Sequence, residues 1–337
     1  MPTVSIIMPM YNSVKYVKQA IESLLNQTYR DIEVIAINDG SKDGCADVVR
    51  SIRDDRLIFI DRENKGFLAT LNECIEMSQG KYIARLDDDD WCYPTRIEKE
   101  VEYLESHPNT VLVGTLCKNQ IGDRIISEPV TPVQTPEQIR YSLVFDNYAF
   151  AHSSFMMRKD VLMKNNIRYE MFKQVPDYHM ITQLSAFGNI ARIQEELVVY
   201  RIHEMQSTQV RSSRMKQDEI DNARAWYIDS LDISKEDKIA LKRGILRKLR
   251  TADDIRKFDE ALDRYRETCG LDETTDKGCI RYLYRNCMFR QLCDFSLLKS
   301  CMKSRSRGWM ISKEGIKFII KCITGRNPSY LETIVKI

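Results

Sequence analysis

Four consecutive aspartates, at positions 87–90, are the residues of this sequence whose types and spacing most plainly point to chemistry. They follow the apolar run 82–86, and they would repel one another strongly without a counter-charge beside them. A hard divalent cation with oxygen ligands supplies such a charge, and Mg²⁺ or Mn²⁺ would keep coordination positions open for substrate phosphates. These residues alone leave an alternative open, which is a solvated acidic loop or the cap of a following helix.

Alternating strand and helix patterns occupy the first 120 residues and would position this run. Apolar runs predict strands at 4–8, 32–37, 57–60 and 82–86, and helical spacing predicts helices at 14–25, 43–53, 67–77 and 94–106, the last with Pro94 as its first residue. This alternation predicts an α/β fold with a mostly parallel, doubly wound, Rossmann-like sheet. Such sheets bind ligands beyond the carboxyl ends of their strands. We therefore expect the segments after the strands, at 11–12, 39–40, 61–66 and 87–90, to meet in one crevice.

The charge is distributed unevenly along the chain. Residues 1–210 hold 23 basic and 30 acidic side chains, whereas residues 211–337 hold 28 and 19. Strand patterns also stop after His203. The sequence thus predicts a domain at 1–210 and a mostly helical, basic extension at 211–337, with no recognisable linker between them.

Composition excludes several classes of protein. No run of about 18 apolar residues predicts a membrane-spanning helix, and the N-terminus leads straight into a strand pattern without a signal peptide, so a cytoplasmic protein is expected. The ten cysteines include no Cys-x-x-Cys pair, which favours reduced, packed thiols over a zinc site.

The order and spacing of six motifs resemble those of family 2 glycosyltransferases. These motifs are 4–12, 20–29, 37–43, 64–66, 80–90 and 94–96, and a weaker resemblance continues through 151–154, 176–178 and 200–203. The resemblance implies a GT-A fold and transfer of a sugar with inversion at the anomeric carbon. It also implies a nucleotide-sugar half at about 1–105 and an acceptor half at about 106–210.

The resemblance assigns donor-binding residues. Asp39 matches the residue that reads the nucleotide base, usually uracil, through its imide N–H; a turn-forming aspartate before Gly40 is the compatible alternative. Leu71 stands where relatives commonly have arginine, which leaves Lys65 and Arg85 as candidate phosphate contacts. The full set of implied nucleotide-binding residues is Pro9, Tyr11, Asn12, Asp39, Asn64, Lys65, Gly66, Arg85, Asp87 and Asp88.

The resemblance also assigns a metal site for Mn²⁺ or Mg²⁺. The second aspartate of Asp87-x-Asp89 matches the family's metal ligand, so Asp89 is the first choice, and Asp87 faces either the ribose or the metal. His203 matches a histidine at the metal-diphosphate end of the site. Asp88 fills a variable position, and Asp90 is left without a definite role.

An inverting transfer needs a base within hydrogen-bond reach of the acceptor hydroxyl. Asp177 matches the family's catalytic aspartate at the start of a helix, although Pro176 replaces the usual preceding glutamate. A helix-capping role is the alternative for Asp177. His152 matches a loop beside the acceptor.

The segment 299–326 is strongly basic, and at 311–323 a helical wheel sets lysines opposite apolar side chains. Two interpretations stay open: a peripheral contact with the inner face of the cell membrane, and a terminal helix packed on the domain. Nucleic-acid binding is not expected, because aromatic residues do not alternate with the basic ones.

Together these features predict a metal-dependent inverting glycosyltransferase of the hexosyltransferase type. The expected donor is a UDP-sugar, and the expected acceptor is a hydroxyl of a glycan or a polyprenyl-diphosphate-linked glycan in cell-surface polysaccharide synthesis. The alternative is a catalytically silent nucleotide-binding subunit that supports a partner enzyme. A nucleotidyltransferase would need a glycine-rich phosphate loop after the first strand, which the sequence lacks.

Overall fold

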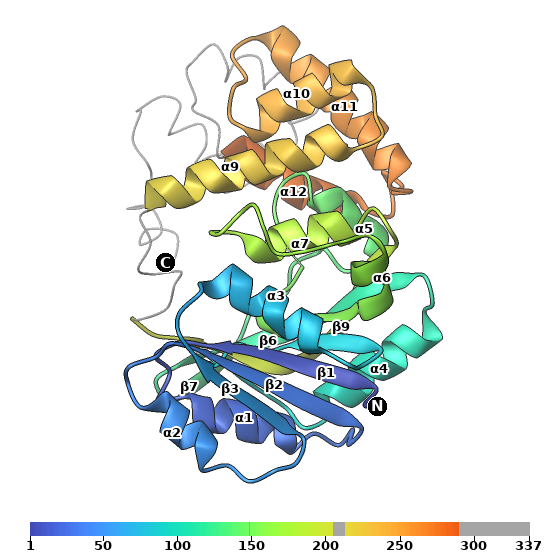
Figure 1. Cartoon of the computed structure of the whole chain (residues 1–337). Coiled ribbons are helices and arrows are strands. Elements are labelled where there is room, and N and C mark those ends of the chain that lie inside the picture. Colours follow the sequence, from blue (N-terminus) through green and yellow to red (C-terminus); the bar gives the residue numbers. More distant parts are fainter. Residues whose placement is uncertain (148, 205–212, 290–337) are drawn as a thin grey trace. The chain divides into compact units, whose positions relative to one another are not determined.

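The computed structural model describes residues 1–147, 149–204 and 213–289. Its contacts divide the chain into two compact units (Figure 1). Within the described residues, the sheet unit comprises residues 1–139, 147, 149–204 and 213–220, and the helical unit comprises residues 140–146 and 221–289. The predicted basic segment 299–326 lies outside the described residues.

A single mixed sheet is the framework of the sheet unit. Its strands are β1 (Val4–Met10), β2 (Ile32–Asp39), β3 (Leu57–Arg62), β4 (Tyr82–Arg85), β5 (Trp91–Cys92), β6 (Thr110–Ile121), β7 (Arg124–Ser127), β8 (Met156–Arg158) and β9 (Asn189–Ile202). They lie in the order β3-β2-β1-β4-β8-β6-β9-β5, with β7 paired to β6. Strands β1 to β4 pair in parallel, as do β6 and β9, whereas β8 runs antiparallel to both of its neighbours. The predicted α/β, Rossmann-like fold is confirmed.

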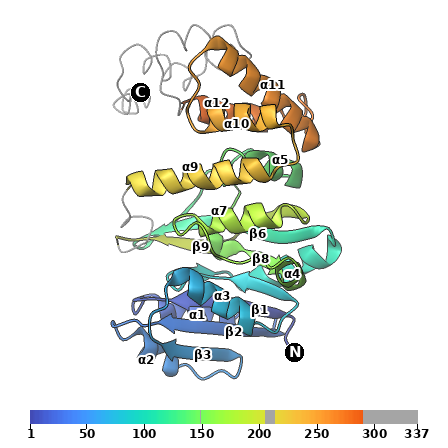
Figure 2. The same ribbon diagram turned by 45° about the horizontal axis from the view of Figure 1, so that its top comes forward.

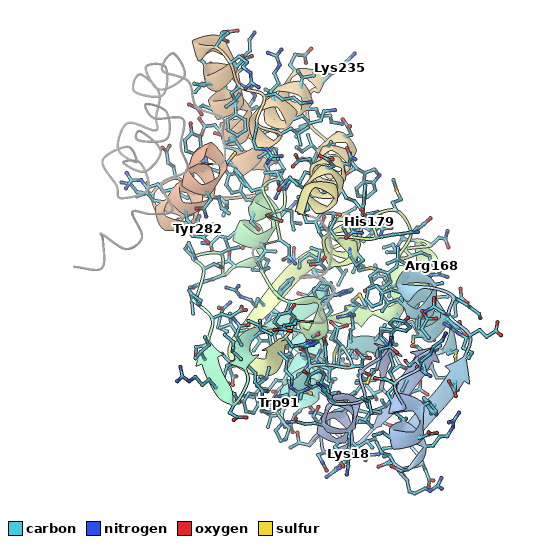
Figure 3. All side chains as sticks on the ribbon, turned by 90° about the vertical axis from the view of Figure 1, so that its left-hand side faces the viewer. Lys18, Trp91, Arg168, His179, Lys235 and Tyr282 are labelled. Carbon is cyan, nitrogen blue, oxygen red and sulfur yellow. The ribbon has the colours of Figure 1, made fainter. Side chains whose placement is uncertain are left out.

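Helices cover both faces of this sheet. They are α1 (Val17–Leu25), α2 (Cys45–Arg50), α3 (Phe67–Met77), α4 (Arg96–Ser106), the 3₁₀ helix η1 (His152–Ser154), α6 (Lys159–Lys164) and α7 (Pro176–Leu184). The helix α5 (Pro136–Ser142) begins in the sheet unit and ends in the helical unit. Figure 2 shows α1 and α2 on one face of the first strands and α3 on the other. Side chains fill the space on either side of the strands (Figure 3).

Burial on both faces explains why the first strands read as continuous apolar runs. Every residue of β1 and β2 is buried. Val4, Ile6 and Met8 join the core that α1, α2 and α4 share. Because side chains alternate along a strand, Ile7 lies on the opposite face, the side of α3.

The register of the parallel strands brings their carboxyl ends to one edge. Met10 at the end of β1 pairs with Asn38 near the end of β2, and Ile7 pairs with Arg85 at the end of β4. The loops that follow these strands therefore start side by side.

The predicted start of the helix after the aspartates is wrong. Pro94 does not begin the helix that follows the aspartates, because α4 starts at Arg96 with Thr95 as its cap. The Pro94 carbonyl instead accepts a hydrogen bond from the Thr28 N–H at 2.8 Å, which holds this residue in the preceding loop.

The helical unit confirms the predicted change to helical structure. Its helices are α9 (Ser213–Ser230), which begins in the sheet unit, α10 (Lys235–Ile245), α11 (Ala252–Thr268) and α12 (Lys277–Phe289). Side-chain oxygens cap two of them, that of Ser234 at α10 and that of Thr251 at α11. The seven cysteines within the described residues are all buried and unpaired with one another. Across that same part of the chain, no helix has both the length and the apolar character needed to cross a bilayer.

A buried ion pair fixes the end of β4 to α4. Arg96 and Glu100 are both fully buried, and Arg96 Nε lies 3.0 Å from Glu100 Oε1. Arg96 Nη2 also donates to the Arg85 carbonyl at 2.8 Å. Burial raises the pKa of Glu100 to about 7 in spite of its partner. The pair thus ties the strand that carries the aspartates to the helix behind it.

We expect Arg96→Met to lower the free energy of unfolding by about 3–5 kcal/mol, because it leaves the Glu100 carboxyl buried without its partner. The double variant Arg96→Met/Glu100→Met should recover most of that loss. Lys81→Met is the matched control, since its partner Glu105 is 52% exposed and an exposed pair contributes about 1 kcal/mol at most. Denaturant unfolding measures all three, and equal losses in the single and double variants would contradict this account.

Candidate active site

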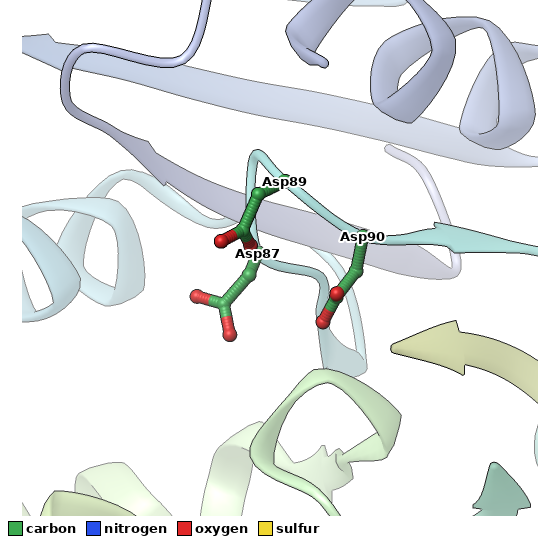
Figure 4. Close-up of side chains that lie close together, drawn as sticks. All are labelled: Asp87, Asp89 and Asp90. Atoms are coloured by element: carbon green, nitrogen blue, oxygen red, sulfur yellow. The ribbon is translucent and has the colours of Figure 1, made fainter. Parts of the chain in front are cut away.

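The aspartate run after β4 folds into a tight cluster. Asp87, Asp89 and Asp90 each present a carboxylate oxygen, and these atoms lie within 4.8 Å of one another (Figure 4). Asp88 is directed elsewhere, since its Oδ2 accepts a hydrogen bond from the Tyr11 N–H at 2.8 Å. Asp88 therefore joins the loop after β1 to the aspartate run after β4.

Two aspartates of the cluster have partners inside the protein. Both guanidinium Nη atoms of Arg85 hydrogen-bond the two oxygens of Asp87. Asp90 is fully buried and accepts the Arg201 N–H at 2.9 Å. The Ser153 hydroxyl lies 2.9 Å from Asp87 Oδ2 and also contacts Asp90. One hydroxyl proton can serve only one of these carboxylates, so a proton on Asp90 would complete the chain of hydrogen bonds.

Crowding of these carboxylates changes their acidity. Burial, followed by the charge of Asp89, raises the pKa of Asp88 to about 8. The same two causes raise the pKa of Asp90 well above its usual value. Burial and neighbouring charge thus disfavour the ionised form of both groups as long as no cation is bound.

His203 contacts one aspartate of the cluster, Asp89. It follows the last residue of β9, and its Nε2 lies 3.0 Å from Asp89 Oδ2. Arg201, two residues earlier, donates to the Asp89 carbonyl at 2.6 Å. The ring of Tyr16 lies beside both, with its centroid 4.8 Å from that of His203.

The cluster has dimensions that suit a divalent cation. Ligands at about 2.1 Å on adjacent corners of an octahedron lie about 3 Å apart, and those on opposite corners lie about 4.2 Å apart. The separation of His203 Nε2 and Asp89 Oδ2, 3.0 Å, matches adjacent corners. The spread of the three carboxylates, up to 4.8 Å, needs only a small contraction to match the longer value. The carboxylates of Asp87, Asp89 and Asp90 therefore form a group that could hold a divalent cation, and His203 hydrogen-bonds one of them, Asp89.

Asp39 forms a second cluster at the end of β2. Its carboxylate accepts the Lys65 N–H at 2.8 Å and the Gly66 N–H at 3.0 Å, and it forms an ion pair with Arg62. The Asn64 side chain donates to the Asp39 carbonyl at 2.7 Å. Burial opposes ionisation, but these donors together lower the pKa of Asp39. The structure thus brings together Asp39, Asn64, Lys65 and Gly66, four of the predicted nucleotide-binding residues.

The loop after β1 lies against this second cluster. Pro9 is buried within β1 and Asn12 has a left-handed backbone, with φ 54°. Asn12 accepts the Lys42 N–H at 3.0 Å and donates its own N–H to the Ser41 hydroxyl at 2.9 Å. Tyr11, between them, is 57% exposed. The loop is therefore tied down while it presents an aromatic ring to solvent.

The two predicted phosphate contacts differ in availability. Arg85 is 1% exposed, and Asp87 occupies its guanidinium. Lys65 is exposed, and its ammonium lies 3.2 Å from Glu73. Leu71, at the position where an arginine was expected, is fully buried. Lys65 is therefore the more accessible of the two side chains.

Asp177 is the second residue of α7, whose cap is Val175, so the helix-capping alternative is wrong. Its Oδ2 lies 3.2 Å from the amide nitrogen of Asn147. Burial raises the pKa of the Tyr169 hydroxyl, and the charges of Arg85, Asp177 and Asp87 also act on it.

His152 and Asn72 hold Tyr169 in place. The Tyr169 hydroxyl lies 2.8 Å from His152 Nε2. Burial and the charge of Arg85 lower the pKa of His152 well below its usual value, so this imidazole is neutral. Asn72 accepts the Tyr169 N–H at 3.0 Å and donates to its carbonyl at 2.8 Å. His152 is therefore committed to an internal contact.

Several residues around the two clusters were not predicted from the sequence. Their backbone positions were within or near recognised motifs, but nothing in a linear sequence indicates which side chain faces the cluster. These residues are Tyr16, Arg62, Ser153, Tyr169 and Arg201. The aspartate cluster could hold a divalent cation, to which an anionic ligand could then bind.

Comparison with known proteins agrees with this geometry. The family model described as glycosyl transferase family 2 matches residues 5–165. An uncharacterized glycosyltransferase of Haemophilus influenzae is 31% identical over 222 residues, which cover 62% of this chain and 68% of that protein.

Solved structures share the fold at low sequence identity. S. aureus TarS in complex with UDP-GlcNAc aligns with a TM-score of 0.61 and 16% identity, covering 90% of this chain and 87% of that one. The mannosyltransferase PcManGT from Pyrobaculum calidifontis, in complex with GDP-Man and Mn²⁺, aligns with a TM-score of 0.53 and 14% identity, covering 96% and 88%. With a curated relative matched over two thirds of its length and a GT-A-like fold around an aspartate cluster, the chain belongs to glycosyl transferase family 2 and is a glycosyltransferase.

Proposed function

We propose that this glycosyltransferase is metal-dependent and inverting, and that it moves a sugar from a UDP-sugar to a hydroxyl of a glycan or a lipid-linked acceptor. The observation that carries the proposal is the group of carboxylates of Asp87, Asp89 and Asp90, whose oxygens lie within 4.8 Å of one another, with His203 Nε2 3.0 Å from Asp89 Oδ2. A divalent cation held there by Asp89, His203 and Asp87 would neutralise the charge of a departing diphosphate. Mn²⁺ and Mg²⁺ are the ions that this donor set suits, and PcManGT was solved with Mn²⁺.

The Asp39 cluster is the proposed base-reading site. Uracil carries a donor at N3, which an ionised carboxylate can accept. Lys65 and Gly66 donate to the Asp39 carboxylate through backbone N–H groups, which the loop holds in place. Arg62 donates through its side chain, which would move aside when the nucleotide enters. Tyr11 would pack on the base, and Pro9, Asn12 and Asn64 would shape its pocket. Lys65 would meet the phosphates, and Arg85 would act through Asp87.

Asp177 is the proposed catalytic base. Its carboxylate would take the proton of the acceptor hydroxyl as the oxygen attacks the anomeric carbon, while the bond from that carbon to the diphosphate breaks and the diphosphate keeps the electron pair. The Asn147 amide, 3.2 Å from Oδ2, would fix the orientation of the carboxylate. Attack opposite the leaving group inverts the anomeric centre.

The same proposal assigns the parts of the chain. Residues 1–105 would bind the donor, 106–210 the acceptor, and 211–337 would form the helical basic extension. A role in cell-surface polysaccharide synthesis, in the cytoplasm at the inner face of the membrane, would suit a lipid-linked acceptor and the basic segment 299–326.

Replacement of the first metal ligand tests the cation site. We expect Asp89→Ala to abolish Mn²⁺-dependent binding of UDP while the fold survives, because the variant loses the first proposed ligand of the metal ion. Isothermal calorimetry with UDP and Mn²⁺ measures the change, with Asp123→Ala in the exposed β6–β7 turn as control. Unchanged affinity in Asp89→Ala would remove the metal assignment.

Replacement of the base tests the reaction. We expect Asp177→Asn to bind the donor normally and to lower turnover by about 10²-fold or more, the scale of a lost general base. Release of UDP from a panel of UDP-sugars measures turnover. Activity within a few-fold of wild type would transfer the role to another group, with exposed Glu170 the next candidate. A wild-type chain that binds UDP and Mn²⁺ but releases no UDP from any donor would be the silent subunit instead.

The acidity of Asp88 predicts a pH dependence of stability. Its pKa is about 8 in the folded chain against a usual 3.8, so the stability that its protonated form contributes is lost as pH rises through about 8. Without metal, the Tm should fall between about pH 6 and pH 8.5. Asp88→Asn should flatten this fall, because asparagine keeps an acceptor for the Tyr11 N–H but cannot ionise. Parallel Tm curves for the two proteins would contradict the assignment.

A further inference from the structure

The ring of Tyr16 contacts two side chains that reach the aspartate cluster, Arg201 of β9 and His203 just after this strand. Its ring centroid is 4.8 Å from that of His203, with an interplanar angle of 33°. The guanidinium carbon of Arg201 lies 5.1 Å from the same centroid. Tyr16 is the cap residue of α1, so its ring brings the start of this helix into contact with the end of β9.

Both neighbours of this ring contact the same aspartate. His203 Nε2 lies 3.0 Å from the Asp89 carboxylate, and Arg201 Nη1 donates to the Asp89 carbonyl at 2.6 Å. The other Nη of Arg201 hydrogen-bonds the side chain of Gln19, one turn into α1. Tyr16 and Gln19 therefore hold the end of β9 against residue 89 from the side of α1.

The position of His203 makes such support necessary. Strand β9 ends at Ile202, and the ladder with β6 ends at the same residue, so backbone pairing stops one residue before the histidine. The direction of the imidazole then depends on side-chain contacts, of which the Tyr16 ring and the Asp89 carboxylate are two. A metal ligand that is held in its binding orientation loses less conformational freedom when the ion binds.

We propose that Tyr16 is a positioning residue, whose ring holds His203 and Arg201 against Asp89 and thereby sets the affinity of the site for a divalent cation. The inference rests on the proposed metal site. Both contacts use the ring rather than the hydroxyl, so phenylalanine should replace Tyr16 without loss, whereas leucine keeps apolar volume but removes the flat surface.

Binding of Mn²⁺, followed by electron paramagnetic resonance with and without UDP, is the first measurement. Tyr16→Leu should bind Mn²⁺ about tenfold more weakly than wild type, the lower end of the effect of losing a group that orients a metal ligand. Tyr16→Phe should bind as wild type does. Tyr103→Leu is the matched control, because it removes a ring stacked at 4.1 Å on another histidine, His107, after α4.

The second measurement needs no metal. The ¹⁵N shift of His203 Nε2 reports its hydrogen bond to Asp89, and the chain has only four histidines, so His203→Gln identifies the signal. Tyr16→Leu should move this shift toward that of a solvent-exposed imidazole, and Tyr16→Phe should not.

The outcomes separate this inference from the proposed function. Wild-type Mn²⁺ affinity in Tyr16→Leu overturns the positioning role and leaves the metal site standing. If wild type itself binds no Mn²⁺, the proposed metal dependence fails, and the ¹⁵N shift decides. A ¹⁵N shift that moves in Tyr16→Leu but not in Tyr16→Phe supports Tyr16 as the residue that positions His203 without a cation. A shift that is unchanged in Tyr16→Leu overturns the positioning role as well as the metal dependence.

Discussion

Four carboxyl groups follow one another at the end of a buried strand, and their mutual repulsion constrains the structure around them. The protein meets this constraint differently at each position. Arg85 neutralises Asp87, and burial raises the pKa of Asp90, which favours its neutral form. The backbone of Tyr11 meets Asp88, and the imidazole of His203 meets Asp89. Only part of the negative charge is thereby balanced, which leaves the cluster suited to a cation.

The partners of the run come from distant parts of the chain, and this requirement shapes the sheet. The parallel order β2-β1-β4 places the loops after β1 and β2 beside the run. The long strand β9 returns to the same edge and delivers Arg201 and His203, more than 100 residues later in the sequence. The buried pair of Arg96 and Glu100 fixes the strand from behind. Fold and site thus depend on one another, since the strands converge where the charge is concentrated.

Much of the donor side could be predicted from the sequence. Strands buried on both faces appear as unbroken apolar runs, and the rule that ligands bind at the carboxyl ends of parallel strands indicated the loops that meet. The prediction failed where a local backbone contact decided the outcome. Pro94 looks like a helix start, yet its carbonyl is engaged by Thr28 in a different loop. Arg85 is an expected phosphate contact, and its pairing with Asp87 is a tertiary detail that the sequence alone does not indicate. Tyr16 reads only as part of an amphipathic helix, because a ring contact with His203 leaves no pattern in sequence.

A crystal of the full chain grown with UDP and Mn²⁺, with diffraction data collected at the manganese absorption edge, tests the central claim most directly. The account predicts one anomalous peak within coordination distance of both Asp89 and His203, in contact with the diphosphate oxygens of the nucleotide. A nucleotide bound in the same crevice with no peak at these two residues, or a peak at a different set of ligands, would contradict it.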